Sequence, residues 1–420
     1  MTKNGQEAEL KRIGLSLGAD LCWPKCFEDI LGDWNPTLNV GGKDVRFEVE
    51  RVTIEPFDLR AGKRYDVVLD RLTHWYKNTR EWIKKAVLMD GLYVLNNPWS
   101  VQSMEKHTSY CAMMRLGLPI PDTWLVPPKE YDDAPDLETT LNRYARFFDL
   151  EEVGRRVGYP SFLKPFDGGG WVGVSKVDSG EDLTKAYDES GKFVMHLQQG
   201  IVPFEKFVRC VGIGADVRVV EYDPSAPLHE RYTKVHDDLP KADLERLRKI
   251  TITINAFFGW DFNSCECLLK DGVWSPIDFA NPCPDSQVTS LHRHFPWLVL
   301  GNLRWAIFNA ATGRKKPASL DWEPYFEIAD GPGTPDEKLD QYAAISEERM
   351  GTKEFEAFCA EHLGPLDQVA LDYFGTDRAK GAVRDKVAAL FPEHEVDEFT
   401  EHFWSEIQAW RDEFSAGVRA

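Results

Sequence analysis

The sequence predicts an α/β chain with several domains. Its 420 residues are enough for two or three domains, each with its own core. A hydrophobic share of 43%, with 12% aromatic residues, is typical of a globular protein and too high for a disordered one. Strand-like and helix-like segments alternate over the first hundred residues, and strand-like segments return after residue 160.

The charge of the chain restricts its partners. With 69 acidic and 50 basic residues, the formal net charge is −19. A field of this sign repels phosphate backbones and anionic lipid surfaces, so we expect neither nucleic acid nor a membrane as a partner. A nucleotide can still bind where basic residues gather in a cleft, because salt screens the more distant charges.

Features of the N-terminus, the apolar segments and the cysteines favour the cytoplasm. Residues 1–12 are polar and lack the apolar core of a signal peptide. The most apolar stretch, Trp297–Ala311, is interrupted by Arg304 and is too short to span a bilayer. The eight cysteines do not form a zinc-site pattern, so we interpret them as reduced packing thiols. The closest pairs are Cys22 with Cys26, and Cys265 with Cys267.

The expected elements fall into three groups. The first hundred residues predict an α/β unit with strands at Ile13–Leu17, Phe47–Ile54, Tyr65–Leu69 and Leu92–Leu95, and helices near Phe27–Leu31 and Arg80–Met89. After a loop at Val126–Asp136, we expect strands at Ser161–Pro165, Val172–Val177, Phe193–Gln198, Lys206–Ile213, Val217–Tyr222, Cys265–Lys270 and Trp274–Asp278, with a helix at Glu181–Glu189. The Gly- and Pro-rich stretch Ala311–Lys338 predicts a boundary, followed by a helical tail for packing or dimerisation.

A glycine run between two strands is the first candidate for chemistry. Gly168, Gly169, Gly170 and Gly173 permit close backbone approach, and their N–H groups can cradle phosphate oxygens. Lys164 lies in the strand just before them, where its ammonium can reach the same phosphates. A dinucleotide-binding fold would need a helix after the glycines, and a Walker loop would need Gly-Lys-Ser/Thr. The pattern therefore predicts a flap over a triphosphate, with a tight hairpin and a surface lysine as the alternative.

A short hairpin supplies the second candidate. Glu266 and Asp278 stand on its opposite arms, which an Asp271-Gly272 turn joins, so the two carboxylates can point into one space. Asn281 adds a neutral oxygen, and such ligands suit magnesium together with water and nucleotide phosphate. A solvated acidic hairpin is the alternative.

A third segment, from Leu197 to Arg209, has the groups to hold a base and a sugar. The amides of Gln198 and Gln199 stand at a strand end, and the carboxylate of Glu205 follows after a turn. The amides can bond the edge of a base, and the carboxylate can bond ribose hydroxyls.

In this order and spacing the segments resemble the ATP-grasp superfamily, and within it the carboxylate–amine ligases typified by D-alanine–D-alanine ligase and the ribosomal-protein glutamate ligases. The resemblance runs from about Asp66 to Asp285 and includes Glu105-Lys106-His107-Thr108 and Leu116-Gly117-Leu118-Pro119. It implies an N-terminal α/β domain (1–100), two α+β subdomains that clasp ATP, one with the glycine flap (101–190) and one with the metal hairpin (191–312), and a helical C-terminal extension (313–420).

The resemblance also implies roles for particular residues. Lys106, Lys164 and the four glycines match the phosphate site of the family, and Glu266, Asp278 and Asn281 match its metal site. The base and ribose site would comprise Gln198, Gln199, Ile201 and Glu205. The implied cofactors are ATP and one or two Mg²⁺ ions, for which Mn²⁺ can substitute.

Two positions depart from the family pattern. The family usually carries glutamates where this chain has Gln198 and Gln199. Its last motif places an acid and an asparagine two positions apart, whereas Asp278 and Asn281 are three apart. A bulge must therefore re-aim Asn281 if that residue is to be a ligand.

The chemistry that the resemblance implies is ligation of a small-molecule carboxylate to an amine through an acyl phosphate, and family habit favours a homodimer. Arg209, Arg218 and Arg231 lie on or beside predicted strands, and their guanidinium groups can hold a carboxylate or a phosphate. Arg231 is the preferred catalytic candidate, with Lys164 and Arg218, and Arg71 is a weaker one. A small-molecule kinase on the same fold and a non-catalytic ATP-binding regulatory module are the alternatives.

Overall fold

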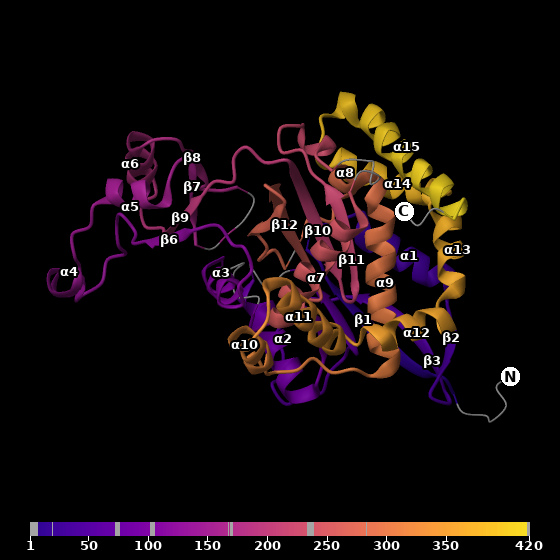
Figure 1. Cartoon of the computed structure of the whole chain (residues 1–420). Helices are drawn as coiled ribbons and strands as arrows, with labels where there is room; N and C mark the ends of the chain where they lie inside the picture. Colours follow the sequence, from indigo (N-terminus) through magenta and orange to yellow (C-terminus); the bar gives the residue numbers. More distant parts are fainter. Residues whose placement is uncertain are drawn as a thin grey trace. The chain divides into compact units, whose positions relative to one another are not determined.

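A computed structural model describes residues 7–18, 20–71, 76–100, 106–166, 168, 171–232, 239–282 and 284–417. The chain forms two compact units (Figure 1). The first comprises residues 1–102, 209–264 and 282–420, and the second comprises residues 103–208 and 265–281.

A five-stranded sheet in the order β2-β3-β1-β4-β5 begins the first unit. β1 runs parallel to β3 and β4, β5 runs parallel to β4, and β2 forms an antiparallel pair with β3. The bounds are β1 Glu9–Ser16, α1 Trp23–Trp34, β2 Thr37–Val40, β3 Lys43–Arg51, β4 Val67–Asp70, α2 Lys77–Asp90 and β5 Tyr93–Leu95. The α/β unit expected from the sequence is confirmed, with element ends shifted by a few residues.

The helix α9 (Phe295–Thr312) is the central helix of the first unit. It is buried on nearly all sides and contacts β1 and β4, as expected for a helix that is apolar all round. Its residues include the apolar stretch Trp297–Ala311, which was predicted to be too short to span a bilayer. Among the described residues, none of the helices combines the length and apolar character needed to cross a membrane.

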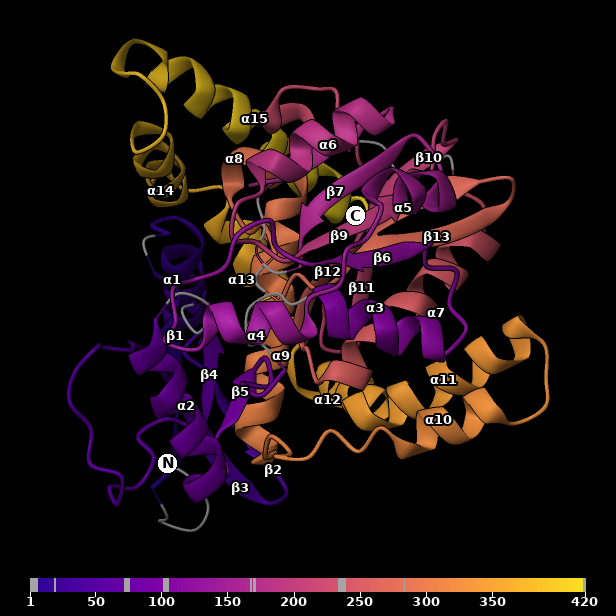
Figure 2. The same cartoon turned by 90° about the vertical axis from the view of Figure 1, so that its left-hand side faces the viewer.

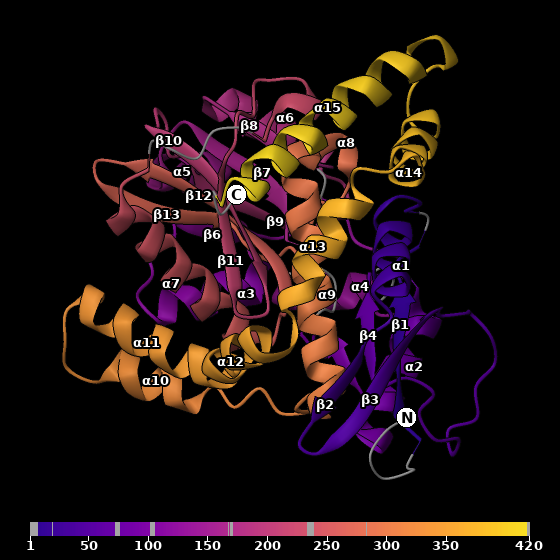
Figure 3. The ribbon, with the colours of Figure 1, turned by 90° about the vertical axis from the view of Figure 1, so that its right-hand side faces the viewer.

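A helical region completes the first unit (Figure 3), and the expected helical extension is confirmed. It consists of α10 Glu323–Asp330, α11 Pro335–Met350, α12 Thr352–His362, α13 Gly364–Tyr373, α14 Asp377–Ala388 and α15 Val396–Ser415. The stretch Ala311–Lys338, where the sequence predicted a boundary, contains the helix α10. Tyr325 of α10 is fully buried and packs edge-on against Phe257, so aromatic packing outweighs the local Gly and Pro content.

A four-stranded sheet has the order β11-β10-β12-β13. Its bounds are β10 Lys206–Ile213, β11 Asp216–Glu221, β12 Phe262–Lys270 and β13 Val273–Asp278. The helices between and after these strands in the first unit are α7 Lys241–Phe258 and the short α8 Val288–Leu291, and 3₁₀ turns lie at Leu228–Glu230, His292–His294 and Glu393–Glu395.

The second unit contains an antiparallel sheet in the order β6-β9-β7-β8. The bounds are α3 Lys106–Arg115, β6 Thr123–Val126, α4 Leu137–Tyr144, α5 Leu150–Val157, β7 Ser161–Pro165, β8 Ser175–Val177, α6 Gly180–Glu189 and β9 Met195–Gln199. The strand expected at Val172–Val177 starts only at Ser175, because Trp171 and Gly173 take positive φ values of 64° and 72° in a turn.

The two faces of this sheet differ in chemistry. α5 and α6 cover one face (Figure 2), where Leu163 and Leu197 join a buried apolar cluster. Because side chains alternate along a strand, Lys164 and His196, which are directly paired, point to the opposite face. That face carries the polar groups of the candidate site.

A buried ion pair in the first unit leads to a stability prediction. Lys316 Nζ lies 2.6 Å from Asp261 Oδ2, both side chains are 2% exposed, and Tyr93 donates to the other oxygen of Asp261 at 3.3 Å. Asp261→Asn leaves the Lys316 charge buried without its counter-charge, so we expect the free energy of unfolding to fall by about 3–5 kcal/mol. Denaturant unfolding followed by tryptophan fluorescence measures this change.

A matched control separates burial from the mere loss of a charge. Asp340 pairs with Lys249 at 2.8 Å but is 64% exposed, so Asp340→Asn should change the unfolding free energy by less than about 0.5 kcal/mol. Adding Lys316→Met to Asp261→Asn should recover most of the loss. Equal effects of the two single substitutions would contradict the assignment of a buried pair.

Candidate nucleotide and metal site

Lys106 opens helix α3 and connects the glycine segment to the β12–β13 hairpin within the second unit. The Lys106 ammonium donates to the Gly168 carbonyl at 2.8 Å and lies 3.4 Å from Asp278 Oδ2. The side chain is nearly fully buried. A phosphate at this point would meet a lysine that a carboxylate and a backbone carbonyl already hold in place.

Lys164 is the second buried cation of the site, and its bonding partners are neutral. Its ammonium donates to Gln198 Oε1 at 2.7 Å and to the Ile277 carbonyl at 3.2 Å. Burial lowers the pKa of Lys164 to about 8; the Asp278 charge opposes this shift and the Lys106 charge adds to it. An anionic ligand at this point would stabilise the Lys164 ammonium, because added negative charge raises the pKa of Lys164.

The structure describes two of the four loop glycines, Gly168 and Gly173. Gly168 has a φ of 96°, and a Cβ there would meet no atom within 4 Å, so the space beside its backbone is open. Gly173 has a φ of 72°, and a Cβ there would lie 3.0 Å from Pro165 Cγ. Gly173 is thus required by both conformation and close approach. Gly169 and Gly170 lie outside the described residues.

The β12–β13 hairpin holds Glu266 and Asp278 directly opposite each other. Asp271 and Gly272 form the turn with φ values of 52° and 74°, as the two-residue hairpin turn requires. The register shifts between Glu266 and Cys267, so Ile277 is an extra residue that the ladder does not pair. Paired residues of an antiparallel ladder share a face, so the two carboxylates share one side, as the sequence predicted.

The donor set of the hairpin fits a hard divalent cation. The Glu266 side chain is buried and that of Asp278 is 26% exposed, so a cation here would be partly shielded and still open to phosphate. The Asn281 amide nitrogen lies 3.5 Å from Asp278 Oδ1, which places Asn281 beside the carboxylate. Within the described ranges, no three His, Cys, Asp or Glu side chains lie close enough together to hold a metal ion. The expected ligand set contributes only two such side chains, Glu266 and Asp278, because its third member is Asn281.

The base and ribose candidates occupy the end of β9 and the segment after it. The Gln198 amide accepts from Lys164 and donates to Thr123 Oγ1 at 2.8 Å, so its side chain is already engaged. Gln199, by contrast, is exposed, and Ile201 is half-buried. Glu205 accepts from the Asp271 backbone N–H at 2.7 Å, which ties this carboxylate to the hairpin turn.

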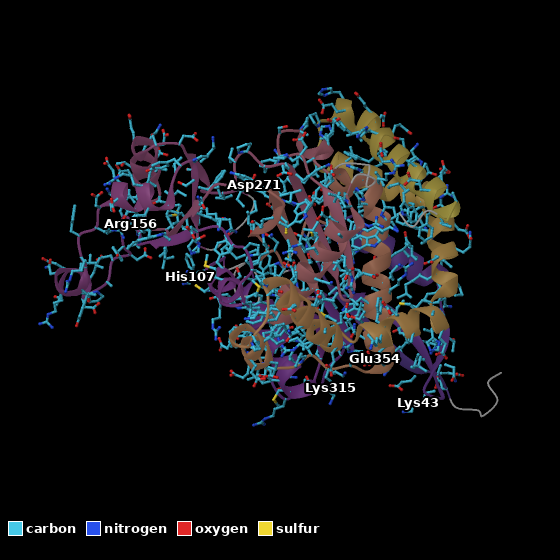
Figure 4. All side chains as sticks on the ribbon, in the orientation of Figure 1. Lys43, His107, Arg156, Asp271, Lys315 and Glu354 are labelled. Carbon is cyan, nitrogen blue, oxygen red and sulfur yellow. The ribbon has the colours of Figure 1, made fainter. Side chains whose placement is uncertain are left out.

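Three residues of this unit were missed by the sequence reasoning. Tyr110 donates its hydroxyl to the Ile277 carbonyl at 2.8 Å, and its ring lies 5.1 Å from the Lys164 ammonium. His107, labelled on α3 in Figure 4, lies 3.1 Å from His196 between ring nitrogens. Burial, His107 and the two lysines lower the pKa of His196 to about 3, so this ring is neutral near neutral pH. The spacing of Tyr110 four positions after Lys106, on one helix face, is the signal that was available.

The arginine candidates belong to the first unit. Arg218 lies 4.6 Å from the Trp297 ring, and burial lowers its pKa to about 9. Arg231 donates from Nε to the Ala226 carbonyl at 3.0 Å. Arg209 donates to the Tyr232 hydroxyl at 2.8 Å, and Arg71 donates to the Pro284 carbonyl at 3.1 Å. Their expected contacts to a substrate stay predictions.

The described cysteines and two neighbouring histidines, His292 and His294, have structural explanations. Those cysteines that the structure describes are free thiols, and Cys22, Cys26, Cys265 and Cys267 are buried, as packing thiols would be. His292 and His294 are buried in the 3₁₀ turn that precedes α9.

Curated relatives match part of the chain. No protein-family model matches it. The D-alanine–D-alanine ligase of Streptomyces griseus is 26% identical over 182 residues, which are 41% of this chain and 44% of that protein. The D-alanine–D-alanine ligase of Lactobacillus acidophilus is 27% identical over 114 residues, 25% of this chain and 29% of that protein. The matches thus span less than half the length of these relatives.

Matches to solved structures cover more of this chain than the curated relatives do, but at lower sequence identity. The match to the D-alanine–D-alanine ligase of Bacillus anthracis in complex with ATP covers 73% of this chain and 98% of that ligase, with a TM-score of 0.48 and 14% identity. A RimK domain ATP-grasp protein of Sphaerobacter thermophilus covers 70% and 97%, with a TM-score of 0.46 and 14% identity. Both TM-scores are below 0.5. The sequence matches name the type of enzyme that the motifs predicted, so the resemblance to D-alanine–D-alanine ligases is confirmed.

Proposed function

We propose that this chain, which resembles D-alanine–D-alanine ligases in sequence, is an ATP-dependent ligase that joins a small-molecule carboxylate to an amine. One observation carries the proposal: two buried lysines, Lys106 and Lys164, stand with the facing carboxylates Glu266 and Asp278 in one unit, beside a glycine loop. Cations for phosphate, carboxylates for a divalent ion and open backbone are the groups that activation by ATP needs.

The proposed reaction has two steps. A substrate carboxylate oxygen attacks the γ-phosphorus of ATP, the bond from that phosphorus to the β-phosphate oxygen breaks, and ADP leaves. The amine nitrogen then attacks the acyl carbon of the acyl phosphate, a C–N bond forms, and phosphate leaves with the oxygen that was the carboxylate's. The amine loses its proton in this step. One carboxylate oxygen therefore ends in the released phosphate.

The residues of this chain would act mainly by electrostatics. The Lys106 and Lys164 ammonium groups bind phosphate oxygens and stabilise the charge that develops during transfer. The backbone at Gly168 leaves room for a phosphate and for an N–H donor. Glu266, Asp278 and, beside them, Asn281 would hold magnesium, which supplies positive charge to the same phosphates when bound. The glycine loop would also exclude water from the acyl phosphate.

Two arginines are proposed to contact the substrate. Arg231 and Arg218 have the planar guanidinium that bonds a carboxylate or a phosphate through two donors. Gln199, Ile201 and Glu205 would hold the base and ribose of ATP. The substrates would be small molecules of the cytoplasm, and the active form would be a homodimer. We propose domains at residues 1–100, 101–190, 191–312 and 313–420.

Thermal shift with ATP and Mg²⁺, separately and together, tests the proposal first. A ligand that binds only the folded protein stabilises it by about 2.7 kcal/mol at one hundred times its Kd. We expect a rise in Tm with ATP that needs Mg²⁺. The absence of a rise at saturating nucleotide would overturn the proposal. ADP release with a phosphorylated product would instead indicate the kinase alternative, and binding without turnover would indicate the regulatory module.

The pKa of Lys164 predicts how ATP binding depends on pH. Burial lowers this pKa to about 8 in the nucleotide-free protein, so the ammonium is present below pH 8 and lost above it. Bound phosphate raises the pKa, so ATP affinity should fall by up to about tenfold per pH unit between pH 8 and the pKa of the complex. Calorimetric titration with Mg²⁺-ATP from pH 7 to 9.5 measures the slope.

A single substitution should move this pH profile. Gln198 accepts from Lys164 as a neutral amide. Gln198→Glu places a carboxylate on the same ammonium and raises the Lys164 pKa, so the fall in affinity should begin at higher pH. A profile that does not move would show that a group other than Lys164 sets it.

A further inference from the structure

Tyr110 makes contacts that the proposed function does not use. It lies on α3, one turn after Lys106, and its side chain is 2% exposed. Its hydroxyl donates to the Ile277 carbonyl at 2.8 Å. Ile277 is the extra residue of the hairpin, one position before Asp278, and Lys164 donates to the same carbonyl at 3.2 Å. The Ile277 carbonyl of β13 thus accepts hydrogen bonds from both Tyr110 and Lys164.

The ring of Tyr110 makes a second set of contacts. The Lys164 ammonium lies 5.1 Å from its centroid, within the range of a cation–π interaction. The Phe279 ring, one position after Asp278, meets it edge-on at 5.4 Å. Tyr110 therefore holds both neighbours of Asp278 and also supports the lysine.

A bulge needs such support. Ile277 has no partner residue in the ladder, and its carbonyl accepts from the Tyr110 hydroxyl and the Lys164 ammonium, so these two donors help to set its direction. The direction of the Ile277 carbonyl sets the peptide plane that leads into Asp278, and with it the aim of the Asp278 carboxylate toward the space it shares with Glu266. Burial and the Asp278 charge raise the pKa of Tyr110, so the hydroxyl keeps its proton and stays a donor.

We propose that Tyr110 is a positioning residue that fixes the bulge at Ile277, and thereby aims Asp278 at the divalent cation while holding Lys164 at the phosphates. This inference rests on the proposed function, because it assigns Tyr110 a role in the same site. Tyr110 would act without touching ATP or the cation. Its effect passes through the Ile277 carbonyl and the Lys164 ammonium.

Two substitutions separate the hydroxyl from the ring. Tyr110→Phe removes only the donor to Ile277 and should raise the Mg²⁺ concentration for half-maximal ATP-dependent thermal shift about five- to tenfold. The ATP-dependent rise in Tm at saturating Mg²⁺ should persist. Tyr110→Leu also removes the ring beneath Lys164, so it should in addition weaken the response to ATP at saturating Mg²⁺.

Tyr187→Phe is the matched control, because Tyr187 is a buried tyrosine in the cluster on the other face of the same sheet. Its Mg²⁺ half-saturation should stay within twofold of wild type. A Tyr110→Phe protein with unchanged Mg²⁺ half-saturation would overturn the inference, even if its Tm without ligand were lower, since that result describes a purely structural tyrosine. If wild type shows no Mg²⁺-dependent ATP shift, the proposed function fails and this inference falls with it.

Discussion

Lys164→Met should abolish the response to Mg²⁺-ATP and leave the nucleotide-free protein at least as stable as wild type. The ammonium is buried, and burial lowers its pKa to about 8, so the folded protein bears a desolvation cost for this charge. Methionine keeps the length and apolar body of the side chain without that cost. Loss of one phosphate donor should reduce ATP turnover roughly 100- to 1,000-fold. Thermal shift and ADP release measure the two effects.

Lys176→Met is the control for Lys164→Met. Lys176 lies on the neighbouring strand β8, is half exposed, and pairs with Asp178 at 2.9 Å. Its removal should leave both the ATP response and ADP release near wild-type values. If Lys164→Met binds Mg²⁺-ATP as wild type does, the phosphate site is elsewhere.

Asp278→Asn should eliminate the dependence of ATP binding on Mg²⁺. The substitution keeps the shape of the side chain but removes the charge that faces Glu266 and lies 3.4 Å from Lys106. An amide binds a hard cation more weakly than a carboxylate, and turnover should fall roughly 100- to 1,000-fold. The measurement is ADP release against Mg²⁺ concentration.

Asp271→Asn provides the comparison within the same hairpin. Asp271 occupies the turn (Figure 4) at a φ of 52°, a conformation that asparagine also adopts readily. Its carboxylate lies at the end of the hairpin away from Glu266, so Mg²⁺ dependence should be unchanged. Equal losses of turnover from Asp271→Asn and Asp278→Asn would mean that only the net negative charge of the hairpin matters, and that Asp278 does not bind a metal ion.

Much of the fold could be predicted from the sequence because its strands are short and clearly marked. Ser161–Pro165 and Lys206–Ile213 were predicted with the bounds that the structure has. Strand alternation also predicted that Glu266 and Asp278 share one side of the hairpin. The helix α10 was missed because its burial depends on Phe257, which is more than sixty residues away in the sequence.

The contacts of the site could be predicted only in part. The type and order of Lys106, Lys164 and the hairpin carboxylates are local features of the sequence. The bond from Lys164 to Gln198 joins neighbouring strands, and the bonds to Ile277 depend on a one-residue shift in register. A bulge leaves little trace in a sequence, so Tyr110 could not be identified as its partner.

The oxygen that leaves with phosphate tests the ligase proposal most directly. The protein would be incubated with ATP, Mg²⁺, hydroxylamine as a general amine, and a pool of small amino acids labelled with ¹⁸O in their carboxylates. Activation through an acyl phosphate predicts ADP, a hydroxamate, and inorganic phosphate that contains ¹⁸O. ADP formed together with a stable phosphorylated product, and without ¹⁸O in the phosphate, would contradict the account and identify a kinase.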